Sequence, residues 1–210
     1  MKNKFLKMAV AGLILSVSGL ANAGLIYDNG GPSTDTGYPI KLPNETADDF
    51  ILAGTANINS VAFYFQNYNG ITGWNQDITY SFYNDNLGSL GSLIASAAGV
   101  NVNAVDSGLP WCCGGGNAWL VNFDLASTVT LSAGHYWLGL TGASGPTPWW
   151  VTTSGITGYN GRYNNSQLGY DFAFSLNDEV QPQNVPEPST LAIFALSLMG
   201  LAARRFKKRA

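Results

Sequence analysis

The stretch Val61-Ala62-Phe63-Tyr64-Phe65-Gln66 (residues 61–66) sets the interpretation of the central part of the chain. Large apolar side chains at 61, 63 and 65 alternate with side chains that are smaller or carry polar atoms. A period of two places successive side chains on opposite faces of a strand. The same alternation recurs at 78–83, 119–124, 135–140 and 169–176. Shorter strands are predicted at 25–27, 47–52, 93–97, 128–131 and 149–153.

Turn-forming clusters rich in Gly, Asn and Ser separate these stretches, as in DNGGPST, NYNGITGWN and YNDNLGSLG. No long amphipathic helix pattern interrupts them. The sequence therefore predicts an all-β fold, a single β-sandwich of jelly-roll type, over residues 24–176. Residues 177–185 (NDEVQPQNV) are polar and contain a proline, which is typical of a linker.

The charge is distributed very unevenly. Between residues 24 and 185 only Lys41 and Arg162 are basic, against twelve acidic residues, so this region has a formal charge of −10. Such a surface repels phosphate backbones, and we expect no nucleic-acid partner. It favours solubility and is compatible with cation binding.

The N-terminal segment, residues 1–23, has the pattern of a signal peptide. Three lysines precede the apolar run MAVAGLILSVSGL, which is followed by ANA. The run is too short to span a bilayer and ends in small residues. We expect signal peptidase to cut between Ala23 and Gly24, leaving an exported domain.

The C-terminal segment, residues 186–210, also carries an apolar run directed at a membrane. A helix expected at about 190–203 contains the 13 residues from Leu191 to Ala203, of which only Ser197 is clearly polar. Those residues would extend about 20 Å, against a hydrocarbon core of about 30 Å. A basic tail follows, formed by Arg204, Arg205, Lys207, Lys208 and Arg209, and it predicts a cytoplasmic end. From these features alone, the segment is either a sorting signal that is removed or a single-pass anchor.

Pro186, Glu187 and Pro188, the short helix and the basic end resemble the PEP-CTERM sorting signal of bacteria. This resemblance implies recognition by an exosortase, a membrane-embedded peptidase that cuts near the PEP motif. The protein would pass through the inner membrane as an intermediate and then reach the cell surface or the extracellular matrix. The resemblance also implies a link to exopolysaccharide or biofilm. More loosely, YDNGG, TADDFIL and YDFAFSL resemble a β-sandwich module of secreted bacterial proteins.

The two cysteines, Cys112 and Cys113, are adjacent. Their Cα atoms are closer than in an ordinary disulfide, so a Cys112–Cys113 bond would be strained. A vicinal disulfide, free thiols and intermolecular crosslinks all stay open. The spacing excludes a CxxC redox site.

Four aspartates, Asp28, Asp48, Asp49 and Asp171, are candidate ligands for a structural calcium ion, although strand geometry places Asp48 and Asp49 on opposite faces. No other cofactor is expected. Asn84–Gly88 resembles the start of a calcium-binding loop, but Ala95 stands where that loop needs Glu, so a hairpin turn is predicted.

Three of the six tryptophans, Trp74, Trp111 and Trp149, fall in predicted loops and are candidates for stacking on sugar rings. Core packing is the alternative. His135, the only histidine, is expected at the surface of a strand, and no nucleophile motif accompanies it.

The leading interpretation is an exported, non-enzymatic β-sandwich protein sorted by an exosortase. A carbohydrate-binding module is the second hypothesis. The third is a glycan-active enzyme with paired carboxylates such as Asp48 and Asp171, which would need to lie about 5–10 Å apart in a cleft.

Overall fold

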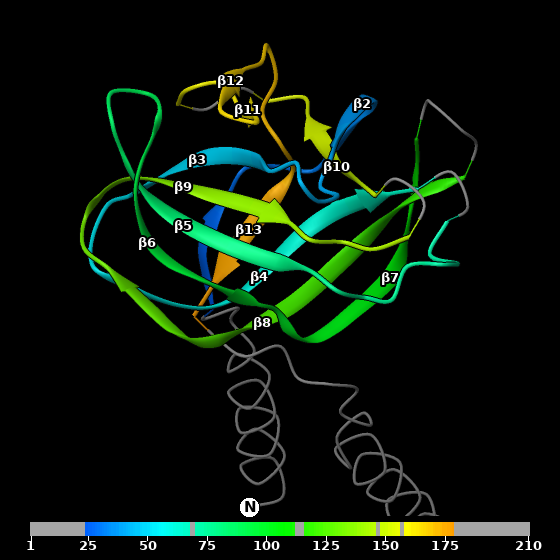
Figure 1. Cartoon of the computed structure of the whole chain (residues 1–210), viewed down its shortest axis with the longest axis horizontal. Coiled ribbons are helices and arrows are strands. Elements are labelled where there is room, and N and C mark those ends of the chain that lie inside the picture. The colour runs from blue at the N-terminus through cyan, green and yellow to red at the C-terminus, as the bar shows by residue number, and fades with distance from the viewer. Residues whose placement is uncertain (1–23, 68–69, 112–115, 146–147, 156–157, 179–210) are drawn as a thin grey trace, which may run out of the picture.

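A computed structural model describes residues 24–67, 70–111, 116–145, 148–155 and 158–178 (Figure 1). Within these residues the chain forms β-strands and turns but no helix. In the same ranges, no helix is long and apolar enough to cross a membrane. The predicted signal peptide, the PEP motif, the C-terminal helix, the basic tail and both cysteines lie outside the described residues.

The larger sheet is built around one long central strand, β4 (Ala56–Gln66). One edge of β4 pairs with β8 (Asn117–Leu131), and the other edge pairs first with β13 (Phe174–Asn177) and then with β10 (Trp149–Thr153). The remaining strands extend this arrangement outward: β1 (Leu25–Asp28) pairs with β13, β2 (Pro32–Pro39) with β10, and β7 (Val100–Pro110) with β8. Every pair is antiparallel.

The smaller sheet is also antiparallel, and its strand order is β12-β11-β3-β9-β5-β6. Its strands are β3 (Thr46–Leu52), β5 (Thr79–Asp85), β6 (Leu90–Ala98), β9 (Gly134–Thr141), β11 (Arg162–Tyr163) and β12 (Ser166–Gln167).

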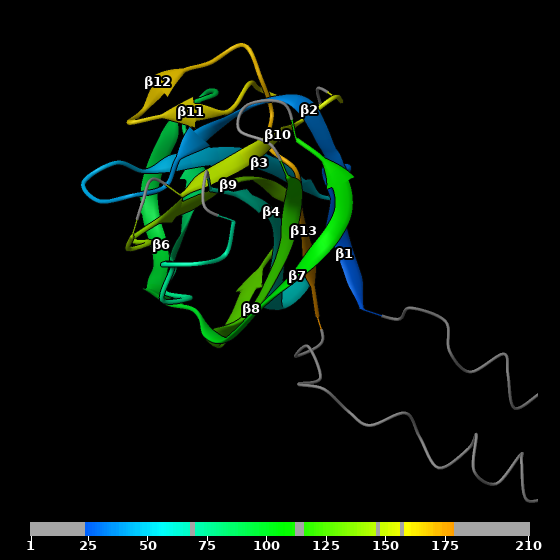
Figure 2. The same ribbon diagram turned by 90° about the vertical axis from the view of Figure 1, so that its right-hand side faces the viewer.

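The two sheets face each other across one aromatic core (Figure 2). The inward positions of β4 are Val61, Phe63 and Phe65, and all three are fully buried. From the smaller sheet, Phe50 lies with its ring centroid 6.5 Å from that of Phe174 in the larger sheet. The prediction of an all-β fold with two sheets is confirmed, and so is the strand at 61–66, although Ala62 and Gln66 on its other face are also buried.

The structure also contains four strands that were not predicted: the two-residue strands β11 and β12, and the longer edge strands β2 and β7. β2 includes part of the predicted turn cluster DNGGPST, and β7 is rich in Asn, Ser and Gly. Residues of these types have low β-propensity, but they are tolerated where only one edge of the strand is paired. The predicted strand 169–176 is shorter than expected because β13 begins at Phe174, while Phe172 forms an isolated bridge with Thr152.

The turn between β5 and β6 is a tight hairpin, as predicted. Asn86 and Ser89 exchange backbone hydrogen bonds of 2.9 and 3.2 Å. Leu87 and Gly88 have φ angles of 51° and 80°, which is the pattern of a type I′ turn.

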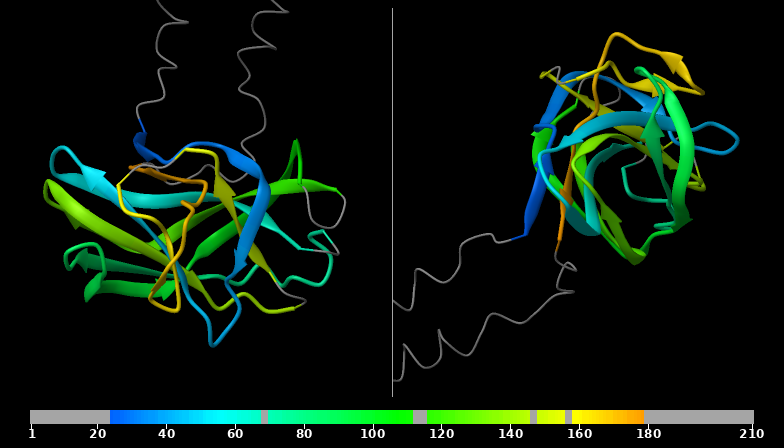
Figure 3. Two further views of the ribbon diagram at one scale, coloured as in Figure 1. Left: turned by 90° about the horizontal axis from the view of Figure 1, so that it is seen from above. Right: turned by 90° about the vertical axis from the view of Figure 1, so that its left-hand side faces the viewer.

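The two ends of the domain lie side by side (Figure 3). Leu25 is paired with Asn177, and the Asp178 N–H donates to the Gly24 carbonyl at 2.8 Å. The N-terminal and C-terminal segments therefore leave the domain at the same place.

Phe50 and Ile51, which are adjacent in β3, test whether this strand has one buried face and one exposed face. Phe50 is fully buried, whereas Ile51 is 56% exposed. We expect Phe50→Ala to lower the free energy of unfolding by about 3–5 kcal/mol, because it leaves a cavity between the sheets. Ile51→Ala is the matched control and should cost less than about 1 kcal/mol. Urea denaturation measures both, and equal losses would contradict the observed register.

Candidate functional site

The strongest concentration of charged and polar groups begins in β3, where two consecutive aspartates point to opposite faces. Asp48 is paired with Leu138 of the core, and Asp49 is paired with Trp137. Neither aspartate side chain is exposed to solvent. The predicted division of these two carboxylates between the faces is confirmed, but both are buried rather than solvated.

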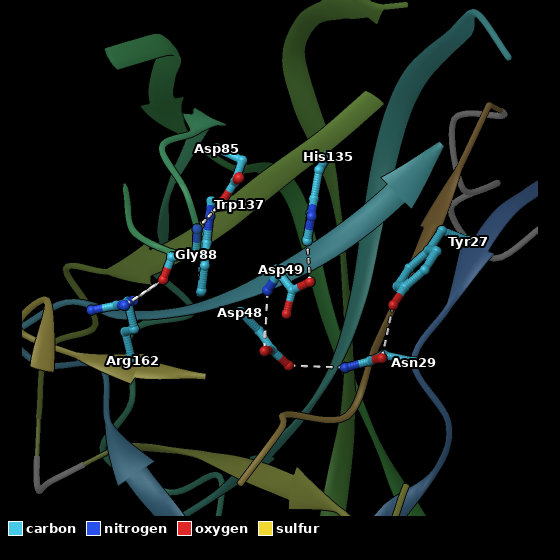
Figure 4. A network of polar contacts seen from close by, with 9 residues as sticks. All are labelled: Tyr27, Asn29, Asp48, Asp49, Asp85, Gly88, His135, Trp137 and Arg162. Atoms are coloured by element: carbon cyan, nitrogen blue, oxygen red, sulfur yellow. Dashed lines mark hydrogen bonds and ion pairs between the residues drawn. The ribbon is translucent and has the colours of Figure 1, made fainter. Parts of the chain in front are cut away.

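On the inner face, Asp48 anchors a hydrogen-bond network that joins three segments (Figure 4). Its Oδ2 accepts from Asn29 Nδ2 at 2.8 Å and from the Phe172 N–H at 2.6 Å. Asn29 Nδ2 also donates to the Phe172 carbonyl at 2.9 Å, and the Tyr27 hydroxyl donates to Asn29 Oδ1 at 2.8 Å. The network ties the end of β1 and the segment before β13 to β3.

Burial raises the pKa of Asp48 well above its ordinary value. The hydrogen bond from Phe172 opposes this shift, and the nearby charges of Asp171 and Asp49 add to it. Burial also raises the pKa of Asp49, against hydrogen bonds from His135 and the Tyr159 backbone. Loss of solvation disfavours the charged form of a carboxylate, and a second negative charge adds to that penalty.

On the outer face, Asp49 forms an ion pair with His135, whose Nε2 contacts Asp49 Oδ2. His135 is 23% exposed and Asp49 is fully buried. The Tyr159 ring lies parallel to the His135 ring, with centroids 4.8 Å apart, and is nearly parallel to the Trp137 ring at 6.3 Å. The segment around Tyr159 thus covers His135 and Asp49.

A second group of contacts holds β11 and the segment around Tyr159 beside Trp137. Trp137 Nε1 donates to Asp85 Oδ1 at 2.9 Å, and the Gly88 N–H donates to the same oxygen at 3.0 Å. Arg162 places its guanidinium carbon 5.4 Å from the centroid of the Trp137 ring and donates from Nε to the Gly88 carbonyl at 3.1 Å. Figure 4 shows the contacts of Asp85, Gly88, Trp137 and Arg162 beside the pair formed by Asp49 and His135.

The outer cluster, which comprises Asp49, Asp85, His135, Trp137, Tyr159 and Arg162, has some of the components of an acid–base site. A histidine oriented by a buried carboxylate is one part of such a site. Among the hydrogen bonds of the described residues, however, none joins His135 to a hydroxyl or a thiol. The contacts present attach the segment around Tyr159 and β11 to the sheet.

The third hypothesis, a carboxylate pair in a cleft, is not supported by the position of the two residues. Asp48 and Asp171 interact electrostatically, but both are fully buried. Neither can reach a glycan in this structure.

The four candidate calcium ligands are not brought together as one site. Asp28 is exposed and accepts from the Gly30 N–H at 2.8 Å, whereas Asp48 and Asp49 are buried on opposite faces. Across the described ranges, no group of three or more His, Cys, Asp or Glu side chains is placed to hold a metal ion.

The predicted exposure of Trp74 and Trp111 is wrong, and Trp149 is only partly exposed. Trp74 is 6% exposed and stacks on Phe65, with ring centroids 4.5 Å apart. Trp111 is 5% exposed and packs edge-on against Trp149 at 5.4 Å. Loops at the ends of a sandwich fold back over apolar surface, so a loop position does not make a large indole accessible.

The pairing of His135 with Asp49 was not predicted from the sequence. The alternation of side chains in the two predicted strands places Asp49 and His135 on outward faces, and this was the only indication in the sequence. It could not show that β3 and β9 are neighbours, nor that the segment around Tyr159 covers both residues.

Titration of the buried carboxylates gives a pH dependence with a definite sign. A group whose pKa is raised by folding contributes most below its unfolded pKa, about 3.8, and loses that contribution as pH rises through its folded value. We therefore expect the free energy of unfolding to increase when pH is lowered from neutrality toward about 4.5. Urea denaturation at both pH values measures this.

The matched variants for this titration are Asp171→Asn and Asp35→Asn. The first removes a charge that faces Asp48 and should reduce the pH dependence. The second changes an exposed aspartate of β2 and is the control. A protein that becomes less stable on mild acidification would contradict the assignment.

A substitution at Gly158 tests how closely the segment around Tyr159 packs over Asp49 and His135. Its φ is +85°, and an added Cβ would lie 2.1 Å from Asp49 Oδ2. We expect Gly158→Ala to cost about 2 kcal/mol or more, because it combines backbone strain with displacement of a buried carboxylate. Gly155→Ala, where an added Cβ meets nothing within 4 Å, is the control. Near-ultraviolet circular dichroism and urea denaturation would report the loss, and equal effects would refute it.

Comparison with known proteins identifies a motif at the C-terminal end of the chain. Residues 184–208 match the PEP-CTERM protein-sorting motif. No curated protein matches the chain. Such motifs mark proteins that are exported and sorted through the membrane by the exosortase system. The chain therefore carries a PEP-CTERM sorting motif next to an all-β domain of two sheets.

Proposed function

We propose that this chain is an exported, non-enzymatic protein of the cell surface or extracellular matrix, delivered by an exosortase. The observation that carries the proposal is the match of residues 184–208 to the PEP-CTERM motif. Signal peptidase would remove residues 1–23, and the C-terminal helix would hold the intermediate in the inner membrane. The exosortase would then cut near Pro186, Glu187 and Pro188.

The position of the domain ends supports this route. Gly24 and Asp178 are joined by a backbone hydrogen bond, so both membrane-directed segments leave from one place. Only residues 179–185 separate the last described residue from Pro186, the first residue of the PEP tripeptide. Seven residues span at most about 25 Å. A folded domain therefore remains close to the membrane until the motif is cut.

A non-enzymatic role fits the arrangement of the reactive groups. The acids of β3 are buried, and His135 is engaged by Asp49 beneath Tyr159. These contacts stabilise the fold and offer no carboxylate pair to a substrate. We accordingly propose that the domain serves as a structural or binding component of the envelope, in a setting linked to exopolysaccharide or biofilm.

The strand order further supports a jelly-roll architecture. We count β1 with β2, β10 with β13, and β7 with β8 as three single units. In the larger sheet, the unit β1/β2 then lies next to the unit β10/β13, which is followed by β4 and the unit β7/β8. The smaller sheet opposite has the order β3, β9, β5, β6. Along the chain, successive units from β1/β2 to β10/β13 alternate between the two sheets. The exception is the β5–β6 hairpin, whose two strands lie in the same sheet. This is the double Greek-key pattern of jelly rolls.

The sorting claim predicts where a motif variant accumulates. We expect Glu187→Ala to remain in the inner-membrane fraction at full precursor length, because the exosortase no longer recognises the tail. Immunoblotting of membrane, surface and medium fractions measures this. Glu179→Ala is the matched control, since it removes the same charge outside the motif. Normal surface delivery of Glu187→Ala would refute exosortase sorting.

A further inference from the structure

Three tyrosine rings lie together where an edge of the larger sheet meets an edge of the smaller one. Tyr38 belongs to β2, Tyr163 belongs to β11, and Tyr170 follows β12. The ring centroid of Tyr38 is 5.9 Å from that of Tyr163 and 6.3 Å from that of Tyr170. Tyr38 also contacts the buried ring of Phe172 edge-on, at 5.8 Å. Together the three tyrosines form the tyrosine face.

The tyrosine face is accessible to solvent. Tyr170 is 44% exposed, and Tyr38 and Tyr163 are partly exposed. Across the described ranges, the one other aromatic side chain that is exposed to a similar degree is Tyr159, at 40%, and its ring stacks on His135. Tyr170 therefore offers the largest exposed fraction of any aromatic side chain that the structure describes.

The hydroxyl groups of the tyrosine face are not used inside the domain. Four other tyrosines have a hydroxyl that hydrogen-bonds within the fold, and these are Tyr27, Tyr80, Tyr83 and Tyr136. Among the hydrogen bonds of the part of the chain that the structure describes, none involves a hydroxyl of the tyrosine face. A phenol hydroxyl can donate and accept, so all three are available to a polar ligand.

The hairpin that carries two of these rings is polar but uncharged. Residues 163–170 have the sequence YNNSQLGY. The exposed Ser166 is paired with Tyr163, so their side chains lie on the same side of the hairpin. Arg162 points to the other side, where its guanidinium lies over the ring of Trp137. The tyrosine face thus combines aromatic rings with neutral hydrogen-bonding groups.

We propose that the tyrosine face binds a neutral polysaccharide. A pyranose ring presents C–H groups on its faces and hydroxyl groups around its edge. It therefore matches an aromatic surface that is flanked by neutral donors and acceptors. The inference rests on the proposed function for the extracellular setting in which the domain would meet such a polymer, and it adds the class of ligand and the residues that bind it.

Charge and position favour this class of ligand. The described residues include eleven acidic and two basic residues, so the domain repels polymers of sugar acids or phosphates. Residues 163–170 contain no carboxylate that would attract a cationic polymer. Figures 1 and 2 show the β11–β12 hairpin on the side of the domain opposite to the end of β13. A domain held at the membrane by its C-terminal segment would therefore direct the tyrosine face outward.

Affinity electrophoresis tests the proposal with the exported protein, purified in the form that the cell releases. Native gels would contain hydroxyethylcellulose, galactomannan, dextran or the exopolysaccharide of the producing cells, with polygalacturonate as the anionic control. We expect at least one neutral polymer to slow migration, and Tyr170→Ala to weaken that binding at least about fivefold. Tyr170→Phe keeps the ring and should retain at least about half of the affinity. Tyr159→Ala is the matched control, because it removes a similarly exposed ring outside the tyrosine face.

Migration that none of these polymers slows would overturn the proposal, and so would equal losses in Tyr170→Ala and Tyr159→Ala. Tyrosine rings also bind proline-rich peptides, so retention by immobilised decaproline without retention by any polysaccharide would overturn it as well. Circular dichroism confirms that each variant remains folded. Sorting is measured separately with Glu187→Ala, so a protein that reaches the surface but binds no polysaccharide would refute only the ligand.

Discussion

The fold depends on the insertion of β13 between β1 and β4. β13 is the last strand of the domain, and its partners are the first strand and the central strand of the larger sheet. This pairing joins residues separated by almost the whole domain, so its loop-closure entropy is among the largest in the fold. The larger sheet is therefore complete only when the C-terminal end of the domain is available to pair.

The buried network of Asp48 reinforces this closure. Asn29 follows β1, Phe172 precedes β13, and both are hydrogen-bonded to Asp48 on the opposite sheet. Burying a carboxylate is costly unless its hydrogen bonds are satisfied, and one-residue slips of a strand would move it to the other face. The network therefore favours one register of β3 and links the two sheets where the chain ends meet.

Sequence reasoning predicted the features that depend on local pattern. Alternation identified the inward residues of β4, and turn composition identified the hairpin at Leu87 and Gly88. It did not predict which strands are neighbours, so the pairing of His135 with Asp49 was missed. It also misjudged Trp74, because burial of a loop residue depends on how the loop folds over the core rather than on its own sequence.

The closing strand pair also connects the fold to sorting. The predicted signal-peptide cut after Ala23 lies just before β1, and the PEP-CTERM match begins at residue 184, beyond the end of β13 at Asn177. The two proposed cuts would thus remove both terminal segments without taking a residue from β1 or β13. Since Gly24 and Asp178 are joined by a backbone hydrogen bond, the proposed release from the membrane would leave the β1–β13 pair, and with it the larger sheet, intact.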